Sequence, residues 1–351
     1  TDIGVDASVK SLKKFGISTI VESGNVNDMN AAALALGGMS KGVSPLEMVA
    51  GYSTFPNKGY YTEPIAYIKV TSKRGEVILE KSATKTQVIN EGVSFIMTDM
   101  LRSVVTSGIG GAAAIGSQPV GGKTGTTSEN YDAWFVGFTP QYAASVWIGN
   151  DVNIELSQGS VSAAKLWSKI MKQVHSGLNA GSFPSAPGNV VSVAVDTKSG
   201  RLPSDLSALD PRGTVRNEYF IKGTEPTTTD NVHVAVNVCS ESNYLATPYC
   251  PNTVSKVFVK RPYAANPSVG DYSYELPSYY CNLHNLDVSK YPIDPNTTLN
   301  PDFNWDGGND GTDGGGITPG ESGNGNGNGN GNGNGNSDDG SEPPDWLNFF
   351  D

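Results

Sequence analysis

Seven consecutive Gly-Asn pairs occupy residues 323–336 and limit how much of the chain can fold. The surrounding segment, residues 291–351, contains 15 of the 42 glycines, 11 acidic residues and no Lys or Arg. Such a composition cannot bury enough apolar surface to offset the conformational entropy that is lost when a backbone becomes ordered. We therefore expect residues 291–351 to form a disordered acidic tail and the fold to be confined to residues 1–290.

The net charge of −11 belongs entirely to this tail. All 24 Lys and Arg residues and the other 24 of the 35 acidic residues fall within residues 1–290, so the part expected to fold is neutral. It has no basic stripe, which argues against nucleic acid as the main partner. Its length suffices for one large domain or two ordinary ones.

Residues 1–178 alternate between helix-like and strand-like patterns. Apolar residues three or four positions apart predict helices at residues 5–15, 30–36, 44–54, 93–105 and 163–174. Alternating apolar residues predict a hairpin across residues 65–79 and strands at residues 123–127, 133–139 and 143–148. Helices that flank a few antiparallel strands predict an α+β fold.

Two of the predicted helices carry more detailed expectations. Ser44, Pro45 and Glu47 form the signature of a capped helix start. In the helix at residues 163–174 we expect a buried face made of the large apolar residues Leu166, Trp167, Ile170 and Val174.

A Pro- and Gly-rich segment, residues 179–188, predicts a linker after this first domain. Beyond it, short alternating runs predict strands at residues 190–195, 233–238 and 254–259. We interpret residues 189–290 as a small β-rich module.

The sharpest local motif is Gly-Gly-Lys-Thr-Gly-Thr-Thr at residues 121–127. A phosphate-binding loop would need a first Gly where Ser117 stands, and a helix after Lys123 where the pattern is strand-like. The alternative is the Lys-Thr-Gly element of penicillin-interacting serine acyltransferases. There a Lys places positive charge beside the nucleophile, Thr hydroxyls bind the substrate carboxylate, and Gly lets the substrate lie against the strand.

The context of this motif is more specific than the motif itself. Five segments occur in a fixed order: Leu-Ala-Leu-Gly-Gly at residues 34–38, Val-Ser-Pro-Leu-Glu-Met-Val-Ala at 43–50, Phe-Pro-Asn-Lys-Gly at 55–59, the motif at 121–127, and Asp-Ala-Trp-Phe-Val-Gly-Phe-Thr-Pro at 132–140. Together they resemble the C-terminal half of the transpeptidase domain of class A penicillin-binding proteins, the bifunctional peptidoglycan synthases. The resemblance covers residues 1–178 and continues less tightly into residues 244–251.

This resemblance implies a penicillin-binding, serine β-lactamase-like transpeptidase fold and a reaction without a cofactor. A Ser attacks a D-Ala-D-Ala peptide, releases D-Ala, and passes the acyl group to an amine of a second peptide strand. Carried over by position, Lys123 and Thr126 are the catalytic candidates, the latter through its backbone N–H in an oxyanion hole. Thr124, Gly125 and Thr126 are the substrate-binding candidates.

The same resemblance calls for a Ser-x-x-Lys nucleophile well over a hundred residues before Lys123, and a Ser-x-Asn element between the two. The earliest matches, residues 11–14 and 23–25, lie too close together to be two catalytic elements, and the stretch around Ser11 resembles the family's helix after Ser-x-Asn. Residues 82–85 lie too near Lys123, and later matches follow it. We expect the nucleophile to lie before Thr1 and this chain to be a C-terminal part of a longer protein.

The partners implied are peptidoglycan stem peptides and β-lactams, on the extracytoplasmic face of a bacterial membrane that is reached through sequence before Thr1. The tail could recruit other cell-wall synthesis proteins. Two alternatives stay open: a carboxypeptidase or β-lactamase-type serine hydrolase, and a non-catalytic wall-binding or partner-binding module.

Three cysteines and one histidine offer a second kind of chemistry. Cys239, Cys250, Cys281 and His284 could form a zinc site, because Cys281 and His284 have ligand spacing. The alternative is a Cys239–Cys250 disulfide with Cys281 unpaired. The extracytoplasmic location implied by the resemblance favours the disulfide, and we expect no metal.

Two patterns of the tail have simpler interpretations. Residues 302–313 reproduce the spacing of a calcium loop, but Asn309 replaces the usual apolar residue, so we interpret them as a polar linker. The apolar cluster at residues 346–350 could be a docking peptide, although chain termini are usually unstructured.

Overall fold

The computed structural model describes residues 3–260 and 271–284. By internal contacts these residues form two compact units. The first unit contains residues 3–204 and 214–230, and the second contains residues 205–213, 231–260 and 271–284. The predicted acidic tail, its calcium-like pattern and its terminal apolar cluster lie outside the described residues.

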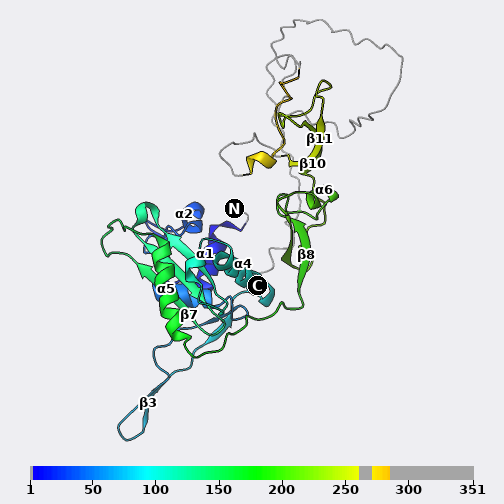
Figure 1. Ribbon diagram of the computed structural model, residues 1–351. Helices are drawn as coiled ribbons and strands as arrows, with labels where there is room; N and C mark the ends of the chain where they lie inside the picture. The colour runs from blue at the N-terminus through cyan, green and yellow to red at the C-terminus, as the bar shows by residue number, and fades with distance from the viewer. Residues whose placement is uncertain (1–2, 261–270, 285–351) are drawn as a thin grey trace, which may run out of the picture. The chain divides into compact units, whose positions relative to one another are not determined.

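The first unit is built on a three-stranded antiparallel sheet with the order β5-β6-β7. Its strands are β5 (Gly121–Thr126), β6 (Ala133–Phe138) and β7 (Ala143–Ile148), as the sequence predicted. Helix α5 (Ser160–Val174) lies along this sheet (Figure 1). The α+β expectation is confirmed.

Helices cover both faces of this sheet. On one face, the ring of Phe135 contacts Trp167 of α5 at 5.2 Å between centroids. On the other face, Ser145 donates its hydroxyl to the carbonyl of Pro45 in α3 (Pro45–Ser53) at 2.9 Å. Helix α4 (Glu91–Thr106) also packs on β5, where a Cβ on Gly121 would lie 3.5 Å from the nitrogen of Arg102. We call these the α5 face and the α3–α4 face.

The core of the unit lies between the sheet and α5. Trp167 is fully buried, and its Nε1 donates to the carbonyl of Ala144 at 2.9 Å. The buried residues that surround it come from α4, η1 (Gly111–Ala113), the sheet and α5: Val105, Ala113, Ile115, Val120, Ala133, Phe135, Ala163, Ala164 and Met171. This core fixes the position of β6, and through it the position of β5.

The buried face of α5 corrects the sequence prediction. Trp167 is buried as expected, but Leu166, Ile170 and Val174 are each more than 40% exposed. Ala163 and Ala164 are buried instead, together with Met171. Small side chains allow a helix to approach a sheet closely, so the helix turns its alanines inward and leaves three larger aliphatic side chains outside.

Predicted helix starts are confirmed at the level of single hydrogen bonds. Helix α2 (Ala31–Ala35) is capped by Asn30, whose Oδ1 accepts from the N–H of Ala33 at 3.0 Å. In α3, Ser44 Oγ accepts from the N–H of Glu47 at 3.2 Å, and Glu47 Oε2 accepts from the N–H of Ser44 at 3.1 Å. Helix α1 (Gly4–Lys14) is followed by Gly16 in the left-handed region, at φ +85°, which ends the helix.

Glu47 has a second role as an anchor for the chain before it. Its Oε1 accepts hydrogen bonds from the N–H and the hydroxyl of Ser18, at 2.9 and 2.6 Å. Burial opposes ionisation of this carboxyl, but the hydrogen bonds from Ser18 and Ser44 outweigh it and lower the pKa of Glu47 to about 2.

The segment between α3 and α4 forms two pairs of short strands. Strands β2 (Lys69–Thr71) and β3 (Val77–Glu80) make the predicted hairpin, which projects away from the body that carries α5 and β7 (Figure 1). Strands β1 (Tyr60–Thr62) and β4 (Lys85–Gln87) pair with each other and were not predicted. Three residues are too few to show an alternation in sequence.

A further antiparallel pair follows the sheet, made of β8 (Val190–Asp196) and β9 (Val215–Ile221). The sequence predicted β8 but missed β9, whose middle is polar. Strand β9 packs on α4, where the rings of Phe95 and Tyr219 meet edge to face at 5.0 Å. The domain boundaries proposed from the sequence stay a prediction.

The second unit contains the antiparallel pair β10 (His233–Cys239) and β11 (Thr253–Val259), together with α6 (Asp205–Ala208) and η3 (Tyr272–Tyr274). Both strands were predicted. A polar cluster stabilises the unit, since Asp210 Oδ2 lies 2.6 Å from Arg212 Nη2 and 3.0 Å from His233 Nε2. Arg212 also lies 3.2 Å from Asp271 and stacks over the ring of Tyr274 at 4.6 Å.

None of the described helices combines the length and the apolar character needed to cross a bilayer.

Candidate active site

Strand β5, which carries the Lys-Thr-Gly motif, forms one edge of the three-stranded sheet. Among the described residues it pairs only with β6, in the register Lys123↔Val136 and Gly125↔Trp134. An unpaired strand edge presents N–H and C=O groups that another extended chain can bind.

The hydrogen-bond pattern shows which backbone groups lie on this open edge. The N–H of Thr127 donates to the carbonyl of Asp132 at 3.2 Å, one step beyond the pair Thr126↔Ala133. Hydrogen-bonded and non-hydrogen-bonded pairs alternate along an antiparallel ladder. The backbone N–H and C=O groups of Lys123 and Gly125 therefore bond to β6. Those of Thr124 and Thr126 point to the open edge.

The side chain of Lys123 supports this assignment independently. Its Nζ donates to the carbonyl of Thr124 at 2.9 Å, which requires that carbonyl to be available outside the β5–β6 ladder. Lys123 is exposed, and because it stands opposite Val136 and Ser145 it belongs to the α3–α4 face. The edge thus carries one cationic group beside an outward carbonyl.

The two threonines of the motif belong to the other face. Thr124 stands opposite Phe135, on the α5 face, and is only 7% exposed. Thr126 is exposed, and its Oγ1 accepts from the N–H of Ser160 at the start of α5, at 3.3 Å. The predicted site residues therefore lie on one strand but on both of its faces, and they converge only at the open edge.

The second and third glycines of the motif, Gly122 and Gly125, have different steric surroundings. A Cβ on Gly122 would lie 2.6 Å from Cζ of Phe135 and 2.7 Å from the carbonyl oxygen of Val136, so the packing of β5 on β6 requires a glycine there. A Cβ on Gly125 would meet only Trp134, whose Cβ and Cγ would lie 3.3 and 3.9 Å away. Because Gly125 has no side chain, no bulk rises from the sheet between Lys123 and Trp134.

Two tryptophans extend this surface across the sheet on the α3–α4 face. Trp134 and Trp147 stand opposite each other with ring centroids 6.3 Å apart, and Trp147 is 39% exposed. Asp132 holds this end of the sheet: its Oδ1 accepts from Trp147 Nε1 at 2.8 Å, and its N–H donates to Thr127 Oγ1 at 2.8 Å. The sequence analysis did not identify Asp132, Trp134 or Trp147 as site residues, although two of them begin the motif at residues 132–140.

The other sequence candidates lie elsewhere. Ser11, the rejected nucleophile candidate, is in α1, which packs against α2. A cavity of about 560 Å³ in the first unit is lined by Pro56, Lys58, Glu91, Pro140, Ser182 and residues 184–188, and by no residue of β5. The chemical groups at the β5 edge, rather than this cavity, define the candidate site.

Comparison with known proteins relates this edge to a family. Residues 1–172 match the family model described as the penicillin-binding protein transpeptidase domain, and residues 186–235 match the model of the C-terminal domain of penicillin-binding protein 1A. Penicillin-binding protein 1A of Clostridium botulinum is 40% identical over 282 residues, which are 78% of this chain and 33% of that protein. The chain belongs to the penicillin-binding protein family.

More distant members of this family are also similar to the chain. Penicillin-binding protein 1A/1B of Bacillus subtilis is 32% identical over 255 residues, covering 64% of this chain and 27% of that protein. The crystal structure of penicillin-binding protein 1A from Haemophilus influenzae superposes with a TM-score of 0.52 and 25% identity, over 65% of this chain and 38% of that one. The chain spans about a third of the length of the first of these penicillin-binding proteins. The transpeptidase match includes β5, so Lys123 lies inside a penicillin-binding protein transpeptidase domain.

Proposed function

We propose that this chain forms the substrate-binding edge of a peptidoglycan D,D-transpeptidase. In this reaction a Ser Oγ attacks the carbonyl carbon of the penultimate D-Ala, the peptide bond to the last D-Ala breaks, and the released amine takes a proton. An amine of a second stem peptide then attacks the acyl-enzyme ester and regenerates the Ser hydroxyl. A β-lactam acylates the same Ser.

The observation that carries the proposal is the open edge of β5. A D-Ala-D-Ala peptide added along this edge as an extra strand would meet the outward C=O of Thr124 and N–H of Thr126. In this proposal the N–H of Thr126 stabilises the oxyanion that develops on the attacked carbonyl. Gly125 between them keeps side-chain bulk away from the incoming chain.

Lys123 supplies the charge for this proposal. Its ammonium group lies at the edge, where it can attract the substrate carboxylate and favour the deprotonated nucleophile. The hydroxyl of Thr126, held by Ser160, is a second contact for the carboxylate. Thr124 contributes through its backbone, because its side chain is buried against the α5 face.

The nucleophile is assigned to a Ser outside this chain. The Ser-x-x-Lys pattern at residues 11–14 lies in α1, which packs against α2, and the pattern at residues 82–85 ends in β4, which pairs with β1. The proposed partners are peptidoglycan stem peptides and β-lactams, at the outer side of a bacterial cell membrane.

A labelling experiment with fluorescent penicillin tests the proposal. The gene product that contains this chain is expected to form a covalent adduct, and the 351-residue chain alone is expected to form none. In the longer protein, Lys123→Ala should slow acylation by about 100-fold, because it removes the cationic group at the oxyanion edge. The rate is measured by stopping the reaction at intervals and quantifying the labelled band.

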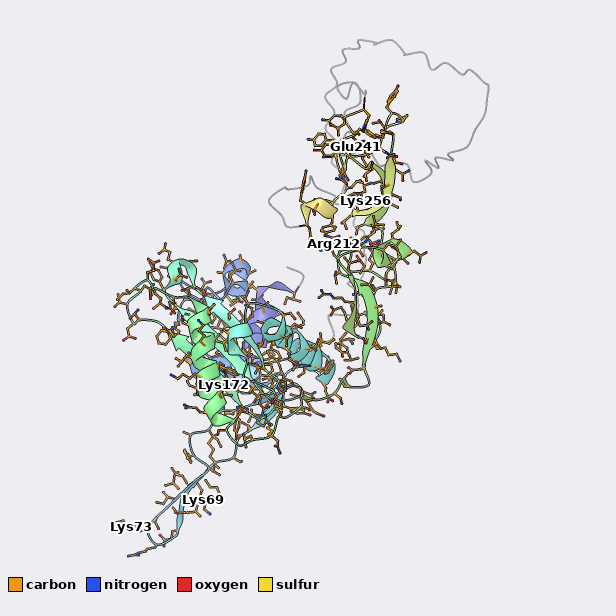
Figure 2. The ribbon with its side chains drawn as sticks, in the orientation of Figure 1. Lys69, Lys73, Lys172, Arg212, Glu241 and Lys256 are labelled. Atoms are coloured by element: carbon orange, nitrogen blue, oxygen red, sulfur yellow. The ribbon has the colours of Figure 1, made fainter. Side chains whose placement is uncertain are left out.

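Lys172→Ala is the matched control. Lys172 is an exposed lysine of α5, as Figure 2 shows. Helix α5 packs on the face of the sheet opposite to that of Lys123. Its replacement should leave the rate of acylation unchanged. Equal rates for the Lys123→Ala variant and the parent would refute the role of the edge, and a label on the short chain would place the nucleophile within residues 1–351. Incorporation of an added amino acid acceptor into the product separates a transpeptidase from a hydrolase.

A further inference from the structure

Four potential metal ligands meet at one end of the β10–β11 pair. They are Cys239, Cys250, Cys281 and His284, which we call the Cys3His cluster. Their three Sγ atoms and one imidazole nitrogen all lie within 4.8 Å of one another. Cys239 and Cys281 are buried, and Cys250 and His284 are half-buried.

Backbone hydrogen bonds bring the three chain segments of the cluster together. At the end of β10, the N–H of Cys239 donates to the carbonyl of Tyr244 at 2.9 Å, which closes a tight turn. The N–H of Cys281 donates to the carbonyl of Leu245 at 2.8 Å. The Cys250 segment ends in its own turn, where the N–H of Cys250 donates to the carbonyl of Thr247 at 3.0 Å. The cysteines are therefore positioned by the fold itself.

The distances within the cluster fit a tetrahedral metal site. Nδ1 of His284 lies 3.2 Å from Sγ of Cys281 and 3.6 Å from Sγ of Cys239. A tetrahedral zinc ion with bonds of about 2.3 Å to sulfur and about 2.05 Å to nitrogen places such atoms roughly 3.5 Å apart. One imidazole nitrogen thus faces two sulfurs at the separation that a shared ion requires.

The other nitrogen of the same imidazole faces a carboxylate. Nε2 of His284 lies 3.5 Å from Oε2 of Glu241, two residues after Cys239. Figure 2 shows Glu241 beyond the strand that carries Lys256, at the end of the β10–β11 pair. A histidine that ligates a metal commonly directs its second nitrogen to a carboxylate, which fixes the orientation of the ring. The contact with Glu241 therefore holds the His284 ring with its Nδ1 toward the cysteines.

A disulfide accounts for the cluster less well. All three cysteines are free in the structure, which does not contain the Cys239–Cys250 disulfide that the sequence favoured. A disulfide needs its two sulfurs about 2.05 Å apart and would involve only two of the four groups. It would leave Cys281 and the inward-facing nitrogen of His284 without a function.

We propose that the Cys3His cluster binds one Zn²⁺ ion as a closed structural site. Three thiols lose their protons on binding and the neutral imidazole contributes its Nδ1, so four protein ligands fill the tetrahedron and leave no position for a substrate. The ion would fasten the segment at residues 271–284 to the β10–β11 pair, in a unit whose buried apolar side chains are few: Val238, Leu245, Phe258 and Val259. This inference is independent of the transpeptidase proposal.

The test begins with the intact 351-residue chain, exported during expression so that a disulfide is free to form. Elemental analysis should find one zinc per chain after gel filtration. Denaturation with a chelator and without a reductant should then release three titratable thiols. A count of one thiol, with no zinc, would overturn the proposal and establish a disulfide.

Variants locate the ion. Cys281→Ser and His284→Gln should lower zinc content at least tenfold, and Asn282→Ala should retain it, since Asn282 is exposed between the two ligands. Cobalt exchanged into the parent chain should show the visible absorption of a tetrahedral thiolate site. Full zinc content in the Cys281→Ser variant would refute the assignment, and the thiol count of the parent decides the question even where a variant fails to fold.

Discussion

The β5 edge and the Cys3His cluster are two chemically specialised sites among the described residues, and they differ in completeness. At the β5 edge, Lys123 and the outward backbone groups of Thr124 and Thr126 face a side of the sheet with no partner strand among the described residues. In the Cys3His cluster, four ligand atoms converge on one another, and a carboxylate orients the histidine. The β5 edge offers hydrogen-bonding groups to an incoming peptide, whereas in the Cys3His cluster a single proposed ion would occupy all four ligands.

This difference indicates how each site depends on its surroundings. An open strand edge is rigid because the sheet behind it is packed, here through Phe135 and Trp167. A closed metal site is rigid because its own ligands are cross-linked through the ion. Loss of core packing should therefore damage the first site and spare the second, provided that the two compact units fold independently.

Replacement of the central core residue is the strongest test of this contrast. Trp167→Ala should reduce the stability of the first unit by about 3–5 kcal/mol, because it removes a fully buried ring and leaves a cavity. Urea unfolding, monitored by hydrogen exchange of peptides from α5 and β6, measures the change in stability of the first unit. Zinc bound by the Cys3His cluster should stay at one ion per chain.

Leu166→Ala is the matched control for that variant. Leu166 is the neighbouring residue of α5 and is 43% exposed, so its loss should cost less than about 1 kcal/mol. Equal destabilisation by the two substitutions would mean that the corrected buried face of α5 is wrong. Loss of zinc from the Trp167→Ala variant would mean that the two units do not fold independently.

A smaller, pH-dependent effect is expected at Glu47. Its pKa is lowered to about 2 in the folded chain, so its hydrogen bonds to Ser18 and Ser44 stabilise the fold above the ordinary carboxyl pKa of about 4.5. This contribution should be lost as the pH falls from about 4.5 to 2. Since Glu47 is only half-buried and solvent screens its charge, we expect no more than about 1 kcal/mol.

The measurement compares Glu47→Gln with the parent by urea unfolding between pH 7 and pH 3. The variant should be less stable near pH 7, and the difference should shrink toward pH 3. A difference that grows as the pH falls would contradict the assigned hydrogen bonds. The Cys3His cluster should respond differently, because acid protonates its ligands and releases the ion.

Much of the first unit could be predicted from the sequence because its signals are local. The capping box of Ser44 and Glu47 is contained in four residues, and the strands β5, β6 and β7 have clear apolar alternation. Strand β9 could not be predicted, because its polar middle hides a strand whose partner on α4, Phe95, is more than a hundred residues away. The buried face of α5 was misjudged since side-chain size alone favoured Leu166 over Ala163.

The candidate site was also predicted in part from the sequence, and the rest needed the structure. The motif identified Lys123 and Gly125, but only the ladder shows that Thr124 and Thr126 direct their backbone groups to the open edge while Thr124 buries its side chain. In the Cys3His cluster, spacing identified the four candidate ligands, yet the proposal of a metal ion rather than a disulfide rests on the distances between them. The contact between Glu241 and His284 joins residues 43 positions apart and leaves no pattern in the sequence.

Amide hydrogen exchange of the 351-residue chain, resolved by residue with NMR, tests the open edge of β5 most directly. The N–H groups of Lys123 and Gly125, bonded to β6, should exchange slowly, whereas the N–H of Thr126, which faces the open edge, should exchange much faster. Slow exchange at Thr126 together with fast exchange at Gly125 would contradict the assigned edge, and with it the proposed oxyanion contact.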